Sequence, residues 1–205
     1  MQYHGTFITI EGIDGSGKST FARALTTALQ ANGTQTMLTK EPGGTTFGLA
    51  IRQLLQDQFN KLNATAEFLL FAADRAQHYH ELIIPGLQRG DWVVTDRSGD
   101  SSLAYQGYGR GLDKNQIIGV NAWATQGVQP TITVYLRVTA ETALARIHAR
   151  PEAMTTFDQA KQEFLQRVID GYETMYAGKK HVIIIDGTLS TEEQVKQFML
   201  LKLAN

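Results

Sequence analysis

Near the start of the chain, a glycine-rich segment joins a short apolar run to a helical pattern. Residues 6–10 are apolar and β-branched, as in a strand, and from Lys18 onward apolar residues recur at helical spacing. The segment between them fits Gly-x-x-x-x-Gly-Lys-Ser, with Gly12, Ile13, Asp14, Gly15, Ser16, Gly17, Lys18 and Ser19 followed by Thr20. In such a loop, backbone N–H groups surround phosphates, the lysine supplies a point charge and the serine hydroxyl binds Mg²⁺. The alternative is an ordinary glycine-rich turn, but the strand before it and the helix after it favour ATP binding by residues 12–20.

Strand and helix patterns alternate along the whole chain. The expected strands cover residues 6–10, 36–40, 91–96, 131–136 and 181–186. The expected helices run from residue 18 to the stop signal at residues 32–33, then over 45–57, 62–84, 113–126, 139–149, 157–176 and 190–203. Pro85 and Gly86 should bend or end the third of these, and residues 107–111 should form a glycine-rich loop. The alternation predicts an α/β P-loop fold with a five-stranded parallel sheet flanked by helices on both faces.

Composition limits the classes of function. The 205 residues suit one full-sized α/β domain spanning 1–205, without repeats or linkers. With 19 basic and 20 acidic residues, the net charge of −1 gives no general attraction to nucleic acid or membranes. The lack of cysteine excludes disulfides, thiolate metal sites and cysteine nucleophiles. No signal peptide and no apolar stretch of roughly 18 residues is present, so a cytoplasmic location is expected.

A second charged element follows the third expected strand. Asp96 and Arg97 lie where ligands bind in open parallel sheets, outside the carboxyl ends of the strands. Asp96 can hold the metal together with Ser19, and Arg97 can clamp a second phosphate group in a bidentate way. The alternative is an Asp-Arg pair that only satisfies loop amides.

Four segments in order carry a family resemblance. Residues 96–107 closely resemble the Asp-Arg…Ser-x-x-Ala-Tyr-Gln-Gly signature of thymidylate kinases, and residues 7–20, 40–45 and 69–77 resemble three further motifs of that family. Together they cover most of residues 6–111. The resemblance is to the bacterial type of this P-loop nucleoside monophosphate kinase family. It implies phosphorylation of dTMP to dTDP with ATP and Mg²⁺, by a homodimer.

The resemblance also implies roles for residues of the acceptor site. By this resemblance, Phe71 would stack on thymine and Arg75 would hydrogen-bond the base edge. Their spacing of four residues does put both on one helix face. Ser102 and Gln106 would contact the base, Asp14 would lie by the sugar 3′-hydroxyl and the metal, and Pro42 would shape the pocket. The acceptor phosphate would meet Arg97 and Arg52, and the remaining substrate-binding residues would be Glu41, Ser101 and Tyr105. Taken singly, Phe71 reads as core, and Arg75 and Arg52 read as solvated.

Residues 141–158 resemble a lid over the triphosphate, with the lid proper at about 146–158. The bacterial type has glycine inside the loop, as at Gly15, and uses lid arginines, which implies catalytic roles for Arg146 and Arg150 beside Lys18, Arg97 and Asp14. The alternative is a solvated basic helix face. The chain departs from the family at Thr155-Thr156, where an Asp-Arg pair is usual, and at Ile169, where arginine is frequent.

Three other functions stay open from the sequence. A deoxynucleoside kinase shares the loop and an acid-arginine pair, and another nucleoside monophosphate kinase would differ only in its acceptor. A non-catalytic nucleotide-binding module would bind tightly without turnover. Trp123 is expected in the core or in a dimer contact.

Overall fold

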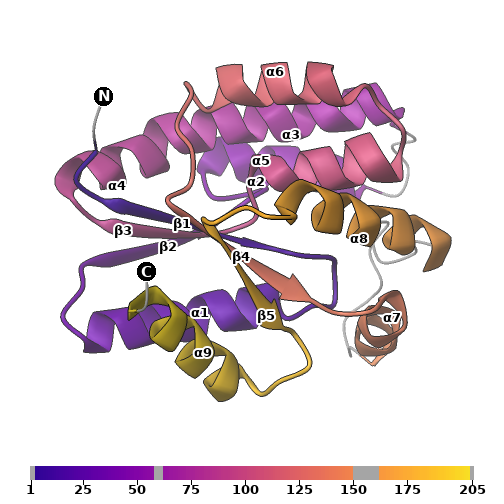
Figure 1. The fold of residues 1–205 in the computed structure, drawn as a ribbon. Coiled ribbons are helices and arrows are strands. Elements are labelled where there is room, and N and C mark those ends of the chain that lie inside the picture. The colour runs from indigo at the N-terminus through magenta and orange to yellow at the C-terminus, as the bar shows by residue number, and fades with distance from the viewer. Residues whose placement is uncertain (1–2, 58–61, 150–161, 204–205) are drawn as a thin grey trace.

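The computed structural model describes residues 3–57, 62–149 and 162–203, which form a five-stranded parallel sheet covered by helices (Figure 1). The strands stand in the order β2-β3-β1-β4-β5. Their bounds are Thr6–Glu11 for β1, Thr36–Lys40 for β2, Trp92–Asp96 for β3, Ile132–Arg137 for β4 and Val182–Asp186 for β5. The predicted fold class is confirmed, and the expected strands match within a residue or two.

Helices cover both faces of the sheet (Figure 1). Helices α1 (Lys18–Ala31) and α9 (Thr191–Leu203) lie on one face. On the other lie α3 (Ala64–His78), α4 (Ile84–Arg89), α6 (Lys114–Ala124) and α8 (Gln162–Tyr176), with α2 (Thr46–Gln56) beside α3 and α7 (Ala140–His148) beside α8. No helix in the described part of the chain is long and apolar enough to cross a membrane.

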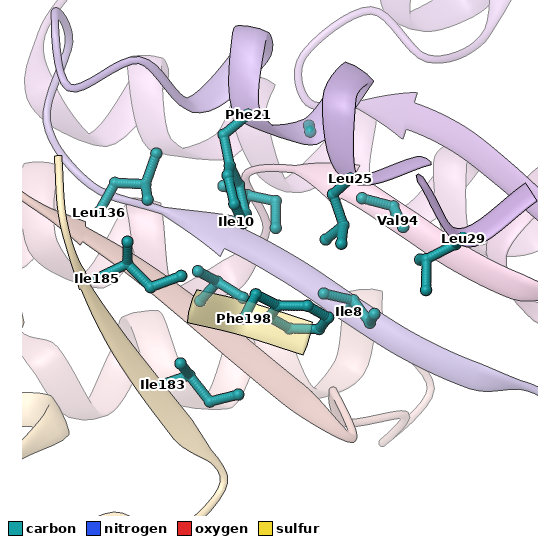
Figure 2. Packing of buried hydrophobic residues seen from close by; sticks show 12 residues of the cluster. Ile8, Ile10, Phe21, Leu25, Leu29, Val94, Leu136, Ile183, Ile185 and Phe198 are labelled. Atoms are coloured by element: carbon teal, nitrogen blue, oxygen red, sulfur yellow. The ribbon is translucent and has the colours of Figure 1, made fainter. Parts of the chain in front are cut away.

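The largest core cluster joins β1, β3, β4 and β5 to α1 and α9 (Figure 2). Ile8 and Ile10 of β1 point at Phe21 and Leu25 of α1, and all four side chains are fully buried. Phe198 of α9 meets Phe21 edge to face, with ring centroids 6.4 Å apart. Burial of each such side chain stabilises the fold by about 1.5–3 kcal/mol, and this packing fixes where α1 begins.

The helix predicted to bend or end at Pro85 and Gly86 does not stop there. After α3 the backbone forms a π-helical turn, η1 (Tyr79–Ile83), and continues as α4 to Arg89. Pro85 follows directly after this π-helical turn, so its missing N–H falls where the helical hydrogen-bond pattern changes. Gly90, with φ of 87°, ends the helix instead.

The region after β3 is also more helical than predicted. Residues Gly99–Ser102 form α5, and Leu103–Gly109 form a second π-helical segment, η2. The expected loop over residues 107–111 is therefore wrong for residues 107–109. A Cβ atom on Gly109 would lie 2.7 Å from the Phe164 ring, so this glycine permits η2 to pack closely on α8. The close packing is what holds the segment helical.

The sheet order places the two predicted phosphate-binding elements together. Strands β1 and β3 are direct neighbours, with Ile10 paired to Asp96. The carboxyl ends of parallel strands meet at one edge, so the loop after β1 lies beside Asp96 and Arg97.

Candidate active site

The loop between β1 and α1 adopts a backbone that requires glycine. Gly12, Gly15 and Gly17 have φ values of 142°, 81° and 97°, a region that side chains rarely adopt. Gly17 occupies the N-cap position of α1 and has no side chain to cap it. The positive end of the helix is thus offered to an anion in the loop.

Gly15 has a second reason to be glycine. A Cβ atom there would lie 2.5 Å from the carbonyl oxygen of Ala143 in α7. Helix α7 therefore packs directly on the loop, and an arginine at this position would need α7 to move. This contact gives a physical reason for the glycine that the resemblance pointed out.

Lys18 is buried under the loop that it follows. Its side chain is 6% exposed, and Nζ donates to the Ile13 carbonyl oxygen at 2.7 Å. Burial and the charge of Arg97 lower the pKa of Lys18 to about 8, against the opposing attraction of Asp14 and Asp96. Near neutral pH, Lys18 is therefore mostly charged, and its ammonium group already lies at the loop.

This pKa predicts that binding of a nucleoside triphosphate takes up protons above pH 8. At about pH 8.5 most Lys18 in the free protein is neutral, and bound phosphates favour the charged form, so binding adds a proton. At about pH 7 Lys18 is already charged and takes up none. Titration calorimetry in two buffers of different ionisation enthalpy measures the uptake, with Lys18→Met as the control that abolishes it. An equal proton count at both pH values would contradict the assignment.

Asp14 and Arg97 form an ion pair at the centre of the site. Arg97 Nη2 lies 2.6 Å from Asp14 Oδ1, while the Tyr105 hydroxyl donates to Asp14 Oδ2 at 3.2 Å and accepts from the Asp14 backbone N–H at 2.9 Å. Burial raises the pKa of Asp14, but Arg97 and Lys18 outweigh it and lower the pKa to about 2. Arg97 Nη1 also donates to the Gly12 carbonyl oxygen at 3.2 Å and to Ser101 Oγ at 2.9 Å. The structure brings together four predicted site residues here: Asp14, Arg97, Ser101 and Tyr105.

Glu11 supports this centre and was not predicted from the sequence. It is fully buried and accepts from the Ser98 N–H at 2.8 Å, Ser101 Oγ at 2.6 Å and the Tyr172 hydroxyl at 3.0 Å. Burial and the nearby Asp100 raise the pKa of Glu11 to about 7. Its bonds fix the turn in which Arg97 adopts φ of 75°. A glutamate at the end of an otherwise apolar strand was the available signal.

Ser19 and Asp96 provide oxygen atoms that suit a magnesium ion. The Ser19 hydroxyl donates to Asp96 Oδ2, while Asp96 Oδ1 is buried without a hydrogen-bond partner among the described residues. Mg²⁺ prefers hard oxygen ligands and is usually held by one or two protein groups, with waters and phosphates completing the shell. The predicted pair is therefore adjacent, and its chemistry fits the ion.

Arg75 is more enclosed than a base-reading arginine need be. Its side chain is 2% exposed and pairs with Glu41 Oε2 at 2.9 Å. It also donates to Asn121 Oδ1 at 2.8 Å and to the Ser98 carbonyl oxygen and Ser102 Oγ, each at 3.1 Å. The guanidinium thus ties α3 to α6 and to the Arg97 turn. The solvated alternative is excluded, and Asn121 is a contact that the sequence did not indicate.

The turn after β2 is held against α2 and α3. Arg52 Nη1 donates to the Pro42 carbonyl oxygen at 3.1 Å, and Asp74 Oδ1 accepts from the Gly43 N–H at 3.0 Å. His78 lies 3.0 Å from Glu41 Oε1 through Nδ1. Arg52 therefore lies at the predicted turn rather than in open solvent.

A cavity of about 260 Å³ extends the loop on the side away from Asp96 and Arg97. It is lined by Gly15, Ser16, Gly17, Thr20, Arg146, Gly187, Leu189, Thr191 and Gln194. Arg146 Nη1 donates to the Gly187 carbonyl oxygen at 2.9 Å and to that of Gly15 at 3.4 Å, which places its guanidinium beside the loop. The wall from residue 187 onward was not predicted, although it begins where β5 ends.

Part of the predicted lid lies outside the described residues. This applies to Arg150 and to the departure at Thr155-Thr156. The other departure, Ile169, is 8% exposed and packs in the core between α8 and β4. At that position the chain has exchanged a frequent charge for apolar packing.

Comparison with known proteins agrees with the geometry. The family model described as thymidylate kinase matches residues 10–198. A thymidylate kinase from Halothermothrix orenii is 44% identical over 191 residues, covering 92% of both chains. One from Synechococcus sp. (strain CC9902) is 46% identical over 180 residues, covering 83% of this chain and 84% of its own. One from Carboxydothermus hydrogenoformans is 41% identical over 198 residues, covering 95% and 97%.

The family match at residues 10–198 includes the end of β1, the phosphate-binding loop, the Asp96-Arg97 turn and most of α9, and so every site residue described above. The chain belongs to the thymidylate kinase family.

Proposed function

We propose that this protein transfers the γ-phosphoryl group of ATP to dTMP, giving dTDP and ADP. The observation that carries the proposal is the position of Arg97. It stands between the loop that holds one set of phosphates and a buried cluster on α3 and η2 able to hold a nucleoside. The family membership and the names of the relatives support the same reaction.

The chemistry needs charge and alignment more than covalent help. Both substrates are anionic, and charge spreads over the transferring group in the transition state. Lys18, Arg97 and Arg146 converge on the loop and would neutralise that charge. Mg²⁺ held by Ser19 and Asp96 would add a further positive charge on the donor phosphates. Arg150 would contribute from the lid.

The site divides into a donor half and an acceptor half. We assign ATP to residues 12–20 and the neighbouring cavity beside Arg146. The acceptor half would use Asp14 for the sugar, Arg97 and Arg52 for the phosphate, and Glu41 and Pro42 for the shape of the pocket. Around the base, the proposed contacts are Phe71, Arg75, Ser101, Ser102, Tyr105 and Gln106.

An assay of ADP release with different acceptors tests the reaction. With Mg²⁺ and ATP, dTMP should support turnover far better than thymidine, dCMP or AMP. A deoxynucleoside kinase would prefer thymidine, another monophosphate kinase would prefer dCMP or AMP, and a binding module would turn over none of them.

We further propose that the protein is a homodimer through α2, α3 and α6. These neighbouring helices expose large apolar side chains: Phe47 at 47%, Leu49 at 51%, Leu69 at 52%, Ile118 at 52% and Trp123 at 84%. The expectation that Trp123 lies in the core of the chain is therefore wrong. We propose the other expected role, a contact in the dimer. An exposed apolar surface of this kind is typical of interfaces.

Trp123→Glu should convert the dimer to a monomer, because it places a charge in the centre of an apolar contact. Sedimentation velocity at micromolar concentration measures the change. Leu200→Glu on α9, where the wild-type leucine is 61% exposed, is the matched control and should leave the mass unchanged. A wild-type protein that sediments as a monomer would contradict the proposal.

We also propose that the chain acts as one kinase domain in the cytoplasm. The donor and acceptor halves both draw residues from the same sheet edge, and the reaction consumes ATP.

A further inference from the structure

Two buried polar side chains on α5 and η2 are contacted by charged residues of α3. Ser102 and Gln106 lie one turn apart and are 2% and 3% exposed. Arg75 Nη2 donates to Ser102 Oγ at 3.1 Å, and Gln106 Nε2 donates to Glu67 Oε1 at 2.7 Å. On α3, Phe71 lies one turn from Glu67 and one turn from Arg75. The two contacts therefore flank the aromatic residue proposed to stack on the base.

Glu67 fixes the orientation of the Gln106 amide. Arg110 forms an ion pair with it, donating from Nε at 2.9 Å and from Nη2 at 2.7 Å. A carboxylate held in this way can only accept hydrogen bonds. The Gln106 amide must consequently turn its NH₂ group toward Glu67 and its carbonyl oxygen away. Within residues 3–57, 62–149 and 162–203, the side-chain hydrogen bond of Gln106 is the one from its NH₂ group to Glu67.

Arg75 occupies one acceptor lone pair of Ser102. A guanidinium can only donate, so Ser102 Oγ must accept from it. The hydroxyl hydrogen of Ser102 then remains available to an acceptor. Side by side, η2 and α5 present one fixed acceptor and one available donor.

We infer that Glu67 is a specificity-determining positioning residue, which holds the Gln106 carbonyl as an acceptor for the N3–H group of a pyrimidine while Ser102 donates to O4. The inference rests on the proposed function, because it requires a pyrimidine beside Phe71. Thymine and uracil carry an N3–H donor and an O4 acceptor, whereas cytosine has an N3 acceptor and an N4 amino donor. Cytosine would set its N3 acceptor against the fixed Gln106 carbonyl and leave that buried group without a partner, and sites built to hydrogen-bond a substrate penalise such analogues strongly.

The substitution Glu67→Gln tests the inference. Glutamine has the same shape, but its amide can donate, so Gln106 is free to turn over. The ratio of kcat/KM for dTMP to that for dCMP should fall at least about tenfold, mainly through KM for dTMP. The values for dTMP and dUMP should fall by the same factor, because both bases carry N3–H. A parallel loss for dTMP and dCMP, or a loss for dTMP without dUMP, would overturn the inference.

A matched pair elsewhere controls for losing an ion pair. Glu173 accepts from Arg137 Nε at 2.8 Å and Nη2 at 2.7 Å, the same two-bond geometry away from the acceptor site. Glu173→Gln should leave the dTMP to dCMP ratio unchanged. If Glu67→Gln does not fold, Gln106→Met removes the acceptor while keeping Glu67, and it should lower the same ratio.

Binding measurements separate this inference from the proposed function. If the wild-type protein fails to phosphorylate dTMP, the proposed reaction is refuted. Calorimetric affinities for dTMP and dCMP still test the role of Glu67, because they need no turnover. Equal affinities in the wild-type protein would overturn the inference on their own.

Discussion

Replacing Lys18 with alanine should reduce kcat for dTMP phosphorylation by at least about a thousandfold. One preorganised group that stabilises transition-state charge contributes roughly a hundred- to thousandfold in rate, and Lys18 is a full charge in a water-poor loop. The loss should appear in kcat rather than only in KM for ATP, because charge on the transferring group grows in the transition state.

The same substitution should not weaken the fold at neutral pH. The pKa of Lys18 is lowered to about 8 from 10.5, so the folded state disfavours the charged lysine. Between those two pKa values the unfolded state binds more protons, so stability rises with pH there. Below about 8 the full cost of the buried charge is present. Lys18→Ala removes this cost and should keep or raise Tm at pH 7.

Coupled ADP release and thermal unfolding measure the two effects. Lys180, which is exposed shortly before the N-terminal end of β5, provides the control, since Lys180→Ala should change neither quantity. A Lys18→Ala variant that keeps a tenth of the activity would contradict the role of the loop.

Replacing Arg97 with methionine should lower kcat/KM for dTMP by about a thousandfold, the second large effect. Arg97 contacts Gly12 of the phosphate-binding loop as well as Asp14, so it can bridge donor and acceptor phosphates. Its loss should reduce kcat and kcat/KM together, which marks a contact made chiefly in the transition state. Arg97→Lys should retain only part of the wild-type rate, because lysine keeps the charge but cannot bind a phosphate group in a bidentate way.

Initial-rate kinetics with each substrate varied in turn measure this pattern. Arg137→Met, which removes an exposed arginine paired with Glu173, is the control for a lost ion pair. A raised KM for dTMP with unchanged kcat would show that Arg97 only binds the acceptor.

The sheet and the phosphate-binding loop were predictable because their signals are local. The strands are short apolar runs bounded by turns. The loop has positive φ values at Gly12, Gly15 and Gly17, and the glycine pattern in the sequence marks these positions. The Asp96-Arg97 pair was found because a parallel sheet gathers its strand ends at one edge. These features depend on neighbours in sequence.

The features that were missed depend on distant contacts. Helix α4 continues past Pro85 because η1 and the sheet hold it, and η2 is helical because Gly109 permits close packing on α8. Glu11 and Asn121 matter through partners 87 and 46 residues away in sequence. Single-sequence patterns can mark an unusual residue such as Glu11 but do not identify its distant partners, and the same limit applies to the Glu67 contact with Gln106.

Measuring the formation of dTDP tests the proposed reaction most directly. Purified protein with Mg²⁺, ATP and dTMP should yield dTDP and ADP in equal amounts, resolved by nucleotide chromatography, and Lys18→Ala protein prepared in parallel should yield almost none. The absence of dTDP from the wild-type reaction, or phosphorylation of thymidine in preference to dTMP, would contradict the proposed reaction.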